Sequence, residues 1–227
     1  MNPAPVHHDL CVLHADDALL VLVKPAGLLS VPGRGPDKQD CLSARAQVLY
    51  PDALIVHRLD MATSGLMLMA RGAGPLRALG DAFATRRVHK RYEAVVSGEP
   101  QNDLHASAGD GWNRIDAPLI ADWPNRPLQK IDAVEGLPSL TRWRTLGRWD
   151  GSDGTLATRV LLEPVTGRSH QLRVHLMSIG HPILGDAFYA PPAVQALSPR
   201  LLLHASEIGF DHPVSGESMR FESHAPF

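Results

Sequence analysis

The sequence predicts an α+β domain with a large mixed, mainly antiparallel sheet that is flanked by helices and loops. Three observations indicate this class: many short apolar runs of strand length, few stretches of helical periodicity, and no apparent internal repeat. The 227 residues, 44% of them hydrophobic, can bury one substantial core. We therefore expect a single folded domain over residues 10–227, preceded by a tail of residues 1–9.

The N-terminal elements are predicted to be a hairpin and a helix. Residues 10–13 and 19–23 are two apolar runs, and Lys24-Pro25-Ala26-Gly27 stops the second of them. Residues 42–50 have the composition of a short helix, which Pro51 ends. The sheet is therefore expected to begin with two adjacent strands before the first helix.

A polar loop follows between two more strand-like runs, residues 55–56 and 65–70. It holds one acid, Asp60, with Arg58 before it and the hydroxyl pair Thr63-Ser64 after it. Loops carried by a rigid scaffold are frequent sites of chemistry. Because a carboxylate in such a setting can act as a nucleophile, Asp60 is the first candidate catalytic residue.

The next segment joins an amphipathic helix to a basic cluster. Leu76, Leu79 and Phe83 recur at helical spacing and predict a helix over residues 75–85. Four basic residues then precede a predicted strand at residues 92–96, namely Arg86, Arg87, Lys90 and Arg91. Two interpretations stay open for this cluster: a solvated helix end that complements the helix dipole, or a set of phosphate contacts.

Residues 102–136 are irregular in composition and carry no clear periodicity. Trp112 and Trp123 lie there among turn residues. An exposed tryptophan beside arginine can stack on a nucleic-acid base, and a tryptophan can equally be a core or lid residue. Strand character returns at residues 140–146 and 155–162.

A second amphipathic helix is predicted to begin near Ser169, whose hydroxyl can cap it. Its apolar positions continue to Ile179, and Arg173 lies in its first turns. A buried arginine is costly unless it is paired, so an acid such as Asp60 is an attractive partner. Residues 201–204 are predicted to form a final central strand.

Charge and composition exclude several classes of protein. A net charge of -2 and a pI near 6.6 argue against a strongly basic nucleic-acid binder, although local patches can still hold phosphate. Twelve histidines form no HExxH pattern, and two cysteines form no CxxC pattern. We therefore expect no metal site.

The chain has no apolar segment or leader pattern that would indicate a membrane or secreted protein. Its apolar runs are far shorter than the roughly 20 residues that span a bilayer, and residues 1–10 have no secretory signal pattern. These features predict a cytoplasmic protein that does not enter membranes. Without an obvious pairing surface, a monomer with no obligate protein partner is expected.

Several motifs resemble those of the RluA family of pseudouridine synthases. The loop from His57 to Gly65 reads HRLDxxTSG, the catalytic loop of that family. Further family motifs follow in family order along nearly the whole chain, at Val23 to Leu28, Lys90 to Ala94, Thr166 to Arg173, Gly180 to Asp186, and Leu203 to Ala205. Ser169 replaces a threonine of many relatives and keeps the hydroxyl. Because residues 1–9 are too short for the S4 RNA-binding module that some relatives carry, no such module is expected.

The resemblance implies the pseudouridine synthase fold and a cofactor-free isomerisation of uridine in structured RNA. It implies that Asp60 is the catalytic carboxylate, that Tyr92 contacts the base and the C5 proton, and that Arg173 is the partner of Asp60. The member of similar length that the chain resembles most modifies both large-subunit ribosomal RNA and a tRNA anticodon stem-loop. Three routes stay open for the carboxylate: attack at C1′, attack at C6, or removal of a sugar proton to form a glycal.

A uridine in a stem-loop must be flipped out before an aspartate can reach it. Arg58 lies two residues before Asp60, on the same face of an extended loop, and is a candidate to fill the gap. Leu172 is expected in the apolar wall of the site, and His57 is a further substrate-binding candidate. The candidates for phosphate contacts are basic residues along the chain: Arg34, Arg86, Arg87, Lys90, Arg126, Lys130 and Arg168.

Two other classes of function are alternatives to the isomerase. A glycosidase-like hydrolase would need a second carboxylate, and no other acid has a comparable motif setting. An RNA-binding protein without catalytic activity would have no need for the intact HRLD loop. Incubation with a uridine-containing stem-loop separates the three classes by product.

Overall fold

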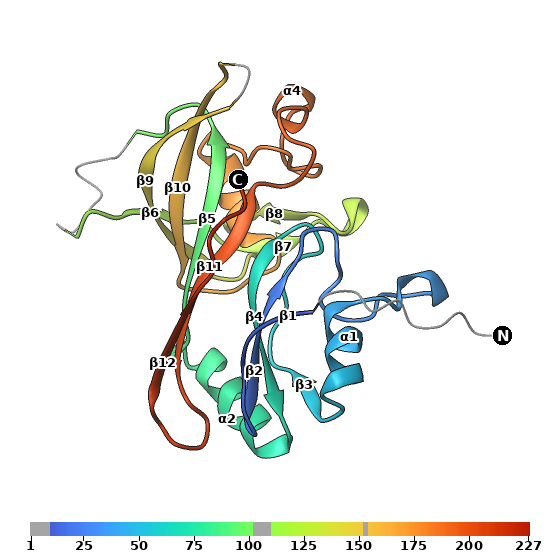
Figure 1. Cartoon of the computed structure of the whole chain (residues 1–227). Coiled ribbons are helices and arrows are strands. Elements are labelled where there is room, and N and C mark those ends of the chain that lie inside the picture. Colours follow the sequence, from blue (N-terminus) through green and yellow to red (C-terminus); the bar gives the residue numbers. More distant parts are fainter. Residues whose placement is uncertain (1–9, 102–109, 152–153) are drawn as a thin grey trace.

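The computed structural model describes residues 10–101, 110–151 and 154–227. The tail predicted at residues 1–9 lies outside these residues, as does part of the irregular segment 102–136. Over the described chain, ten strands form one twisted sheet in the order β1-β2-β4-β11-β5-β10-β9-β6, with β3 paired to β4 and β12 paired to β11 (Figure 1). Apart from β4 and β11, every pair of neighbours is antiparallel, so the predicted mixed, mainly antiparallel sheet is confirmed.

The strands of the large sheet are β1 (Cys11–Ala15), β2 (Leu19–Lys24), β3 (Ala53–Ile55), β4 (Ser64–Arg71), β5 (His89–Ser97), β6 (Asn113–Asp116), β9 (Leu140–Asp150), β10 (Leu156–Pro164), β11 (Leu203–Asp211) and β12 (Ser218–Glu222). A separate hairpin pairs β7 (Leu119–Ala121) with β8 (Gln129–Ile131). The helices are α1 (Leu42–Leu49), α2 (Ala73–Ala84), α3 (Gln171–Ser178) and α4 (Pro192–Gln195), with 3-10 turns η1 (Pro36–Lys38) and η2 (Trp123–Asn125).

The sheet has two halves that meet where β4 lies parallel to β11. We call β1 to β4 the N-terminal half, and β5, β6, β9, β10 and β11 the C-terminal half. The parallel contact is short, with register pairs only between Ser64 and His204 and between Gly65 and Ala205. Gly65 has a φ of +113°, and a Cβ there would collide with the backbone of Ala205. Glycine is therefore needed where the halves join.

The N-terminal half is covered on both faces, which follows from the alternation of side chains along its strands. From β2, Leu20 and Leu22 pack in a cluster with Leu42 of α1. Their neighbours Leu19 and Val21 pack on the opposite face, in the cluster that contains α2. β2 and β4 are nearly continuous apolar runs because both faces of these strands are covered, whereas the edge strand β1 alternates with exposed positions.

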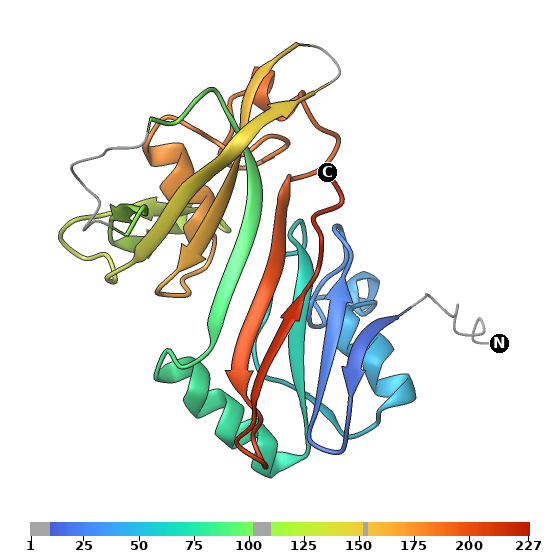
Figure 2. The same ribbon diagram turned by 60° about the vertical axis from the view of Figure 1, so that its left-hand side comes forward.

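The C-terminal half packs its core against α3. Residues of β5, β9, β10 and α3 share one buried cluster with residues 183–184 and 201–203. In Figure 2 the long strands β5 (green) and β11 (orange) lie side by side through the middle of the molecule. These two strands therefore form the centre to which both halves attach.

Most of the predicted elements are confirmed in type, with bounds that differ by a few residues. The cap predicted at Ser169 is wrong: α3 begins at Gln171, its N-cap is His170 with left-handed φ, and no side chain caps it. Ile179, predicted on the buried face of this helix, lies after its last turn and is 36% exposed. The strand predicted at residues 201–204 begins at Leu203, continues to Asp211 and is followed by β12, which was not predicted.

In the part of the chain that the structure describes, no helix is long and apolar enough to cross a membrane. Across the same residues, histidine, cysteine and acidic side chains form no group that could hold a metal ion.

Candidate active site

The loop between β3 and β4 carries Asp60 and is held in place by hydrogen bonds of its backbone groups. The Leu59 amide donates to the Ser30 hydroxyl at 3.0 Å, and this hydroxyl donates to the Leu59 carbonyl at 2.7 Å. The Thr63 amide donates to the Asp60 carbonyl at 3.1 Å and closes a turn. Because both main-chain groups of Leu59 are bonded, the residue before the acid has a fixed position.

Lys24 supports the same loop from inside the protein. Its side chain is fully buried at the end of β2, and its ammonium group donates to the carbonyls of Leu28 at 2.7 Å, Pro25 at 2.8 Å and Met61 at 3.0 Å. Burial lowers the pKa of Lys24 to about 8, although the charge of Asp60 acts in the opposite direction. The lysine therefore fixes the backbone on the other side of Asp60.

His57 holds the beginning of the loop. Its Nε2 accepts a hydrogen bond from the Leu68 amide at 2.9 Å, and its ring stacks on Phe83 with centroids 4.7 Å apart. Burial first, and then the positive charge of Lys90, lowers the pKa of His57 to about 3. The imidazole is therefore neutral at physiological pH and serves as a hydrogen-bond acceptor.

Arg173 lies between two carboxylates. It makes a bidentate pair with Asp186, from Nε to Oδ2 at 2.8 Å and from Nη2 to Oδ1 at 2.6 Å. Its third nitrogen, Nη1, donates to Oδ2 of Asp60 at 3.3 Å, so the predicted pairing of these two residues is confirmed. The stronger partner of Arg173 is Asp186, which the sequence interpretation had not assigned.

Exposure distinguishes the two acids. The side chain of Asp60 is 30% exposed, whereas those of Asp186 and Arg173 are 1% and 4% exposed. Asp186 is therefore sealed inside and neutralises the buried guanidinium. Asp60 keeps one contact to the arginine and faces outward, which leaves it available to a ligand.

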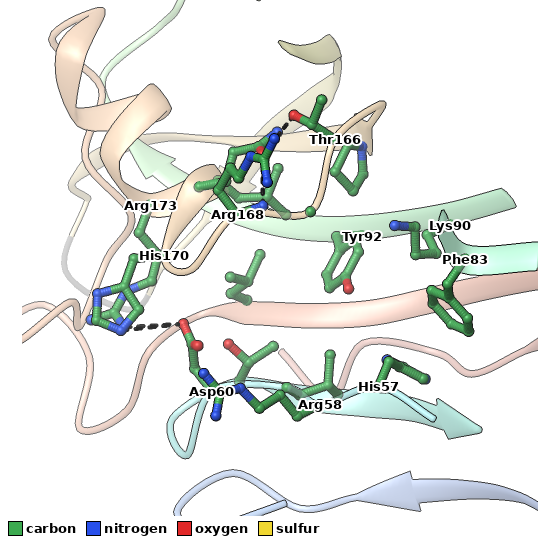
Figure 3. Close-up of a pocket in the computed structure, with 17 residues that line it drawn as sticks. His57, Arg58, Asp60, Phe83, Lys90, Tyr92, Thr166, Arg168, His170 and Arg173 are labelled. Carbon is green, nitrogen blue, oxygen red and sulfur yellow. Dashed lines mark hydrogen bonds and ion pairs between the residues drawn. The ribbon is translucent and has the colours of Figure 1, made fainter. Parts of the chain in front are cut away.

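Asp60 opens into a cavity of about 240 Å³ between the two halves of the sheet (Figure 3). Its walls come from the loop around Asp60, from β5, β11, α2 and the start of α3. The lining residues are His57, Arg58, Leu59, Asp60, Thr63, Phe83, Lys90, Tyr92, Pro164, Thr166, Gly167, Arg168, His170, Gln171, Leu172, Arg173 and Leu203. This volume is somewhat below the roughly 300–1,000 Å³ of pockets for drug-sized ligands, so it suits a ligand no larger than a single nucleoside.

Tyr92 of β5 lies in the wall of the same cavity as Asp60 (Figure 3). Burial, and then the negative charge of Asp60, raises the pKa of the Tyr92 phenol. The hydroxyl group therefore stays protonated, and the ring offers an apolar face with a polar tip.

A model of the family described as RNA pseudouridylate synthase matches residues 18–178. The chain belongs to this family. The dual-specificity RNA pseudouridine synthase RluA of Escherichia coli (strain K12) is 47% identical over 226 residues, which cover 100% of this chain and 97% of the relative. The protein of the same name from Vibrio parahaemolyticus is 49% identical, with coverage of 90% and 78%.

A solved structure supports the same family. Human RNA Pseudouridylate Synthase Domain Containing 1 has a TM-score of 0.78 and 26% identity, with coverage of 100% of this chain and 87% of that one. RNA pseudouridine synthases are isomerases, so the reaction class is established for this synthase.

The cavity of the synthase brings together eight of the residues that the sequence singled out. They are the three candidate catalytic residues Asp60, Tyr92 and Arg173 with Arg58, Leu172, Arg168, His57 and Lys90. A second hollow shares His57, Lys90 and Arg168 with the cavity and extends to Arg86. Arg87 lies farther along the same surface, where it lines a third hollow with Arg86 and Lys90. The basic cluster therefore leads to the mouth of the site.

Other predicted RNA contacts lie elsewhere. Lys130 is on β8, and the guanidinium of Arg126 lies 3.1 Å from the ring centroid of Trp123 at the tip of the same hairpin. Trp123 is 64% exposed, whereas Trp112 is 6% exposed beneath three arginines. Of the two tryptophans weighed as base-stacking residues, only Trp123 is placed where a base could reach it. None of these residues, nor Arg34, lines the cavity.

Several residues of the site were not singled out from the sequence. They are Lys24, Phe83, Asp186, His170, Thr166 and Gln171. Five of them lie inside the family motifs, and Phe83 marks only the predicted helix, so the signal was present but gave no role. Asp186 also answers the hydrolase alternative, because both of its oxygens are bonded to Arg173 and cannot serve as a second catalytic acid.

Proposed function

We propose that this synthase converts specific uridines to pseudouridine in two RNAs, large-subunit ribosomal RNA and a tRNA anticodon stem-loop, with Asp60 as the essential carboxylate. The observation that carries the proposal is the position of Asp60, which opens into a nucleoside-sized cavity and is partly exposed, whereas Arg173 and Asp186 beside it are buried. The dual specificity follows from the name and the 47–49% identity of the relatives.

The chemistry requires little beyond an anion and a closed space. The N1 to C1′ bond breaks, the base turns, C5 bonds to C1′, the C5 proton leaves and N1 gains a proton. Nothing is oxidised or reduced, so no cofactor is required. All three routes open to Asp60 begin from its ionised form, and the charge-assisted contact with Arg173 stabilises that form.

Tyr92 is proposed to hold the base while it is detached. Its ring can stack on the uracil and its protonated hydroxyl lies in the same wall as Asp60. Leu172 and Leu203 provide apolar surface that keeps water away from the detached base. The Tyr92 hydroxyl is the group proposed to reach the C5 proton.

RNA is proposed to enter along the basic surface at the mouth. Flipping the target base costs a few kcal/mol, and the exposed Arg58 beside Asp60 is proposed to occupy the space that the base leaves. Arg168, Lys90, Arg86 and Arg87 are proposed to contact phosphates near the site, with Arg126 and Lys130 farther along the RNA. His57, which holds the loop, is proposed to contact the nucleotide at the cavity edge.

We also propose that residues 10–227 act as one catalytic domain, as a cytoplasmic monomer. The continuous sheet shared by both halves supports the single domain. Size-exclusion chromatography with light scattering, with and without RNA, tests the monomer.

The test uses stem-loops that carry tritium at C5 of uridine, one from large-subunit ribosomal RNA and one from a tRNA anticodon arm. We expect release of tritium from both, with a product of unchanged mass. Asp60→Asn should lower the release at least about 10³-fold, because the amide keeps the shape of the side chain but loses its negative charge. Binding of the stem-loop should change by less than threefold.

Asp52→Asn is the matched control, because Asp52 is an exposed acid paired with Arg71 outside the cavity. It should retain full activity. Release of free uracil would show that the protein is a hydrolase and not an isomerase. Normal turnover by Asp60→Asn would show that Asp60 is not the essential carboxylate. Activity on one RNA alone would restrict the proposed specificity to that RNA.

A further inference from the structure

His170 lies beside the catalytic carboxylate in a backbone conformation that side chains rarely adopt. It has a φ of 54° and is the residue immediately before α3. Non-glycine residues in this region are uncommon and concentrate at functional sites. The conformation turns the imidazole toward the cavity, where Nε2 lies 3.8 Å from Oδ2 of Asp60 (Figure 3).

The other ring nitrogen of His170 is held by Tyr189. The Tyr189 hydroxyl accepts a hydrogen bond from the backbone amide of Gln129 at 2.9 Å, and it lies 2.6 Å from Nδ1 of His170. Because the amide can only donate, the hydroxyl proton is available for Nδ1. The other tautomer would leave that proton without an acceptor among the described residues. Nδ1 is therefore the acceptor, and a neutral imidazole then carries its proton on Nε2.

The charges around His170 favour the neutral ring. Two acids and two arginines face it, namely Asp60, Asp186, Arg173 and Arg58. Burial lowers the pKa of His170, and this effect is larger than the opposite effect of the negative charge of Asp60. Arg173 also lowers the pKa, and its two hydrogen bonds to Asp186 offset the charge of that acid. At neutral pH the group that faces Asp60 is thus an uncharged N–H donor.

The two oxygens of Asp60 have different surroundings. Arg173 donates to Oδ2 at 3.3 Å, and Nε2 of His170 approaches the same oxygen. Within the described residues, no hydrogen bond reaches Oδ1. A carboxylate held by one oxygen presents the other in a defined direction.

We infer that His170, held in its Nε2–H form by Tyr189, is a positioning residue that fixes Oδ2 of Asp60 together with Arg173 and leaves Oδ1 to react with uridine. The inference rests on the proposed role of Asp60. The distance of 3.8 Å is longer than a hydrogen bond, as is common for catalytic contacts without substrate, and it shortens when the base fills the cavity.

A pair of variants separates the N–H group from the bulk of the ring. His170→Gln keeps an N–H donor at a similar reach, whereas His170→Leu removes it, and both carry the same left-handed backbone cost. We expect kcat to fall by about 10- to 100-fold in the leucine variant, since small errors of position have effects of this size. The glutamine variant should retain kcat within about fivefold, and KM should change little in both because RNA contacts lie elsewhere.

A second measurement needs no change in His170. Nitrogen-15 NMR of the imidazole groups in the unaltered protein at pH 7.5 should show the His170 ring as the Nε2–H form. Tyr189→Phe keeps the aromatic packing and removes the hydroxyl, so it should yield a mixture of tautomers and a lower kcat.

The outcomes separate the two proposals. If unaltered protein releases no tritium from either stem-loop, the proposed function fails, whatever tautomer NMR reports. If it is active, the positioning role is overturned by a leucine variant with normal kcat, by equal losses in the glutamine and leucine variants, or by an Nδ1–H or doubly protonated ring at pH 7.5.

Discussion

At the scale of single residues, the site is organised around Arg173, a charge that is almost fully removed from water. Asp186 offsets the cost of burial through two short hydrogen bonds, and its Oδ1 also accepts the backbone amides of Phe188 and Tyr189. One buried acid thus orients both the arginine that contacts Asp60 and the turn that presents Tyr189. Asp186 is therefore a structural residue whose contacts position other groups of the site.

Asp186→Asn should destabilise the protein by about 3–5 kcal/mol, because a buried arginine would lose its main counter-charge. Urea unfolding measures this directly. Asp52→Asn removes the same kind of arginine partner at the surface, where Asp52 is 46% exposed, and should cost at most about 1 kcal/mol. Equal losses in the two variants would mean that Asp186 does not neutralise Arg173.

At the residue scale, one contact of the site could be predicted from the sequence. The confirmed pairing of Asp60 with Arg173 was inferred from the cost of a buried arginine. Asp186 escaped because nothing in the sequence distinguishes an acid that is 1% exposed from one at the surface of a turn. Burial depends on the packing of α3 against β9 and β10, which periodicity does not report.

At the scale of elements, the short parallel contact between β4 and β11 is the critical join. Its two register pairs require close approach of the backbones, which Gly65 permits. The adjacent Ser64 hydroxyl accepts from Arg200 at 2.6 Å and bonds with His204 at 2.8 Å. The end of the loop that carries Asp60 is therefore held by hydrogen bonds across the join.

Gly65→Ala should lower the free energy of unfolding by at least about 3 kcal/mol, because left-handed strain of roughly 1–2 kcal/mol adds to a collision with Ala205. Gly72→Ala is the matched control, since Gly72 has a φ of +88° and open space around it. Gly72→Ala should lower the free energy of unfolding only by the left-handed backbone strain. If urea unfolding gives the same loss for both, the backbones at the join have room to separate.

Elements were predictable from sequence where apolar residues form runs. β2, β4, β5 and β10 lie in buried parts of the sheet, so their apolar runs stood out. β7 and β8 have three residues each, and β12 alternates with exposed positions, so none of them produced a clear run. The helix cap was wrongly predicted at Ser169 because His170 precedes the helix in a left-handed conformation, which the residue type does not predict.

At the scale of the whole molecule, buried histidines set the response to acid. Burial lowers the pKa of His57 to about 3 and that of His204 to about 4, and it also lowers those of His170 and His175. In the unfolded chain these groups titrate near 6.5. Between the folded and unfolded values the unfolded chain binds more protons, so stability falls as the pH falls.

We expect the free energy of unfolding to decrease from pH 6.5 downward, by about 1.4 kcal/mol per pH unit for each such histidine. His57→Gln keeps an acceptor for the Leu68 amide without a titrating ring, and should reduce this slope by about one proton. The exposed His224 is the control, and His224→Gln should leave the slope unchanged. A flat profile between pH 6.5 and 5 would contradict the buried neutral state of these rings.

The architecture as a whole was the most predictable level, because the order and length of apolar runs limit the possible folds. What could not be predicted was how the runs pair. The neighbours β4 and β11 are more than 130 residues apart in the chain, and only the folded sheet brings them together.

The division of the sheet has a consequence for how this enzyme tolerates change. Asp60 is anchored to the N-terminal half through Lys24 and Ser30, whereas Arg173 and His170 belong to the C-terminal half. The spacing between Asp60 and these two residues is thus a distance between two separately supported parts that share only the short contact of β4 with β11. A substitution far from the cavity that shifts one half of the sheet relative to the other would change this spacing and lower turnover without contact to a reacting group. Among variants distant from the cavity, we therefore expect the largest losses of activity at positions along the β4–β11 contact.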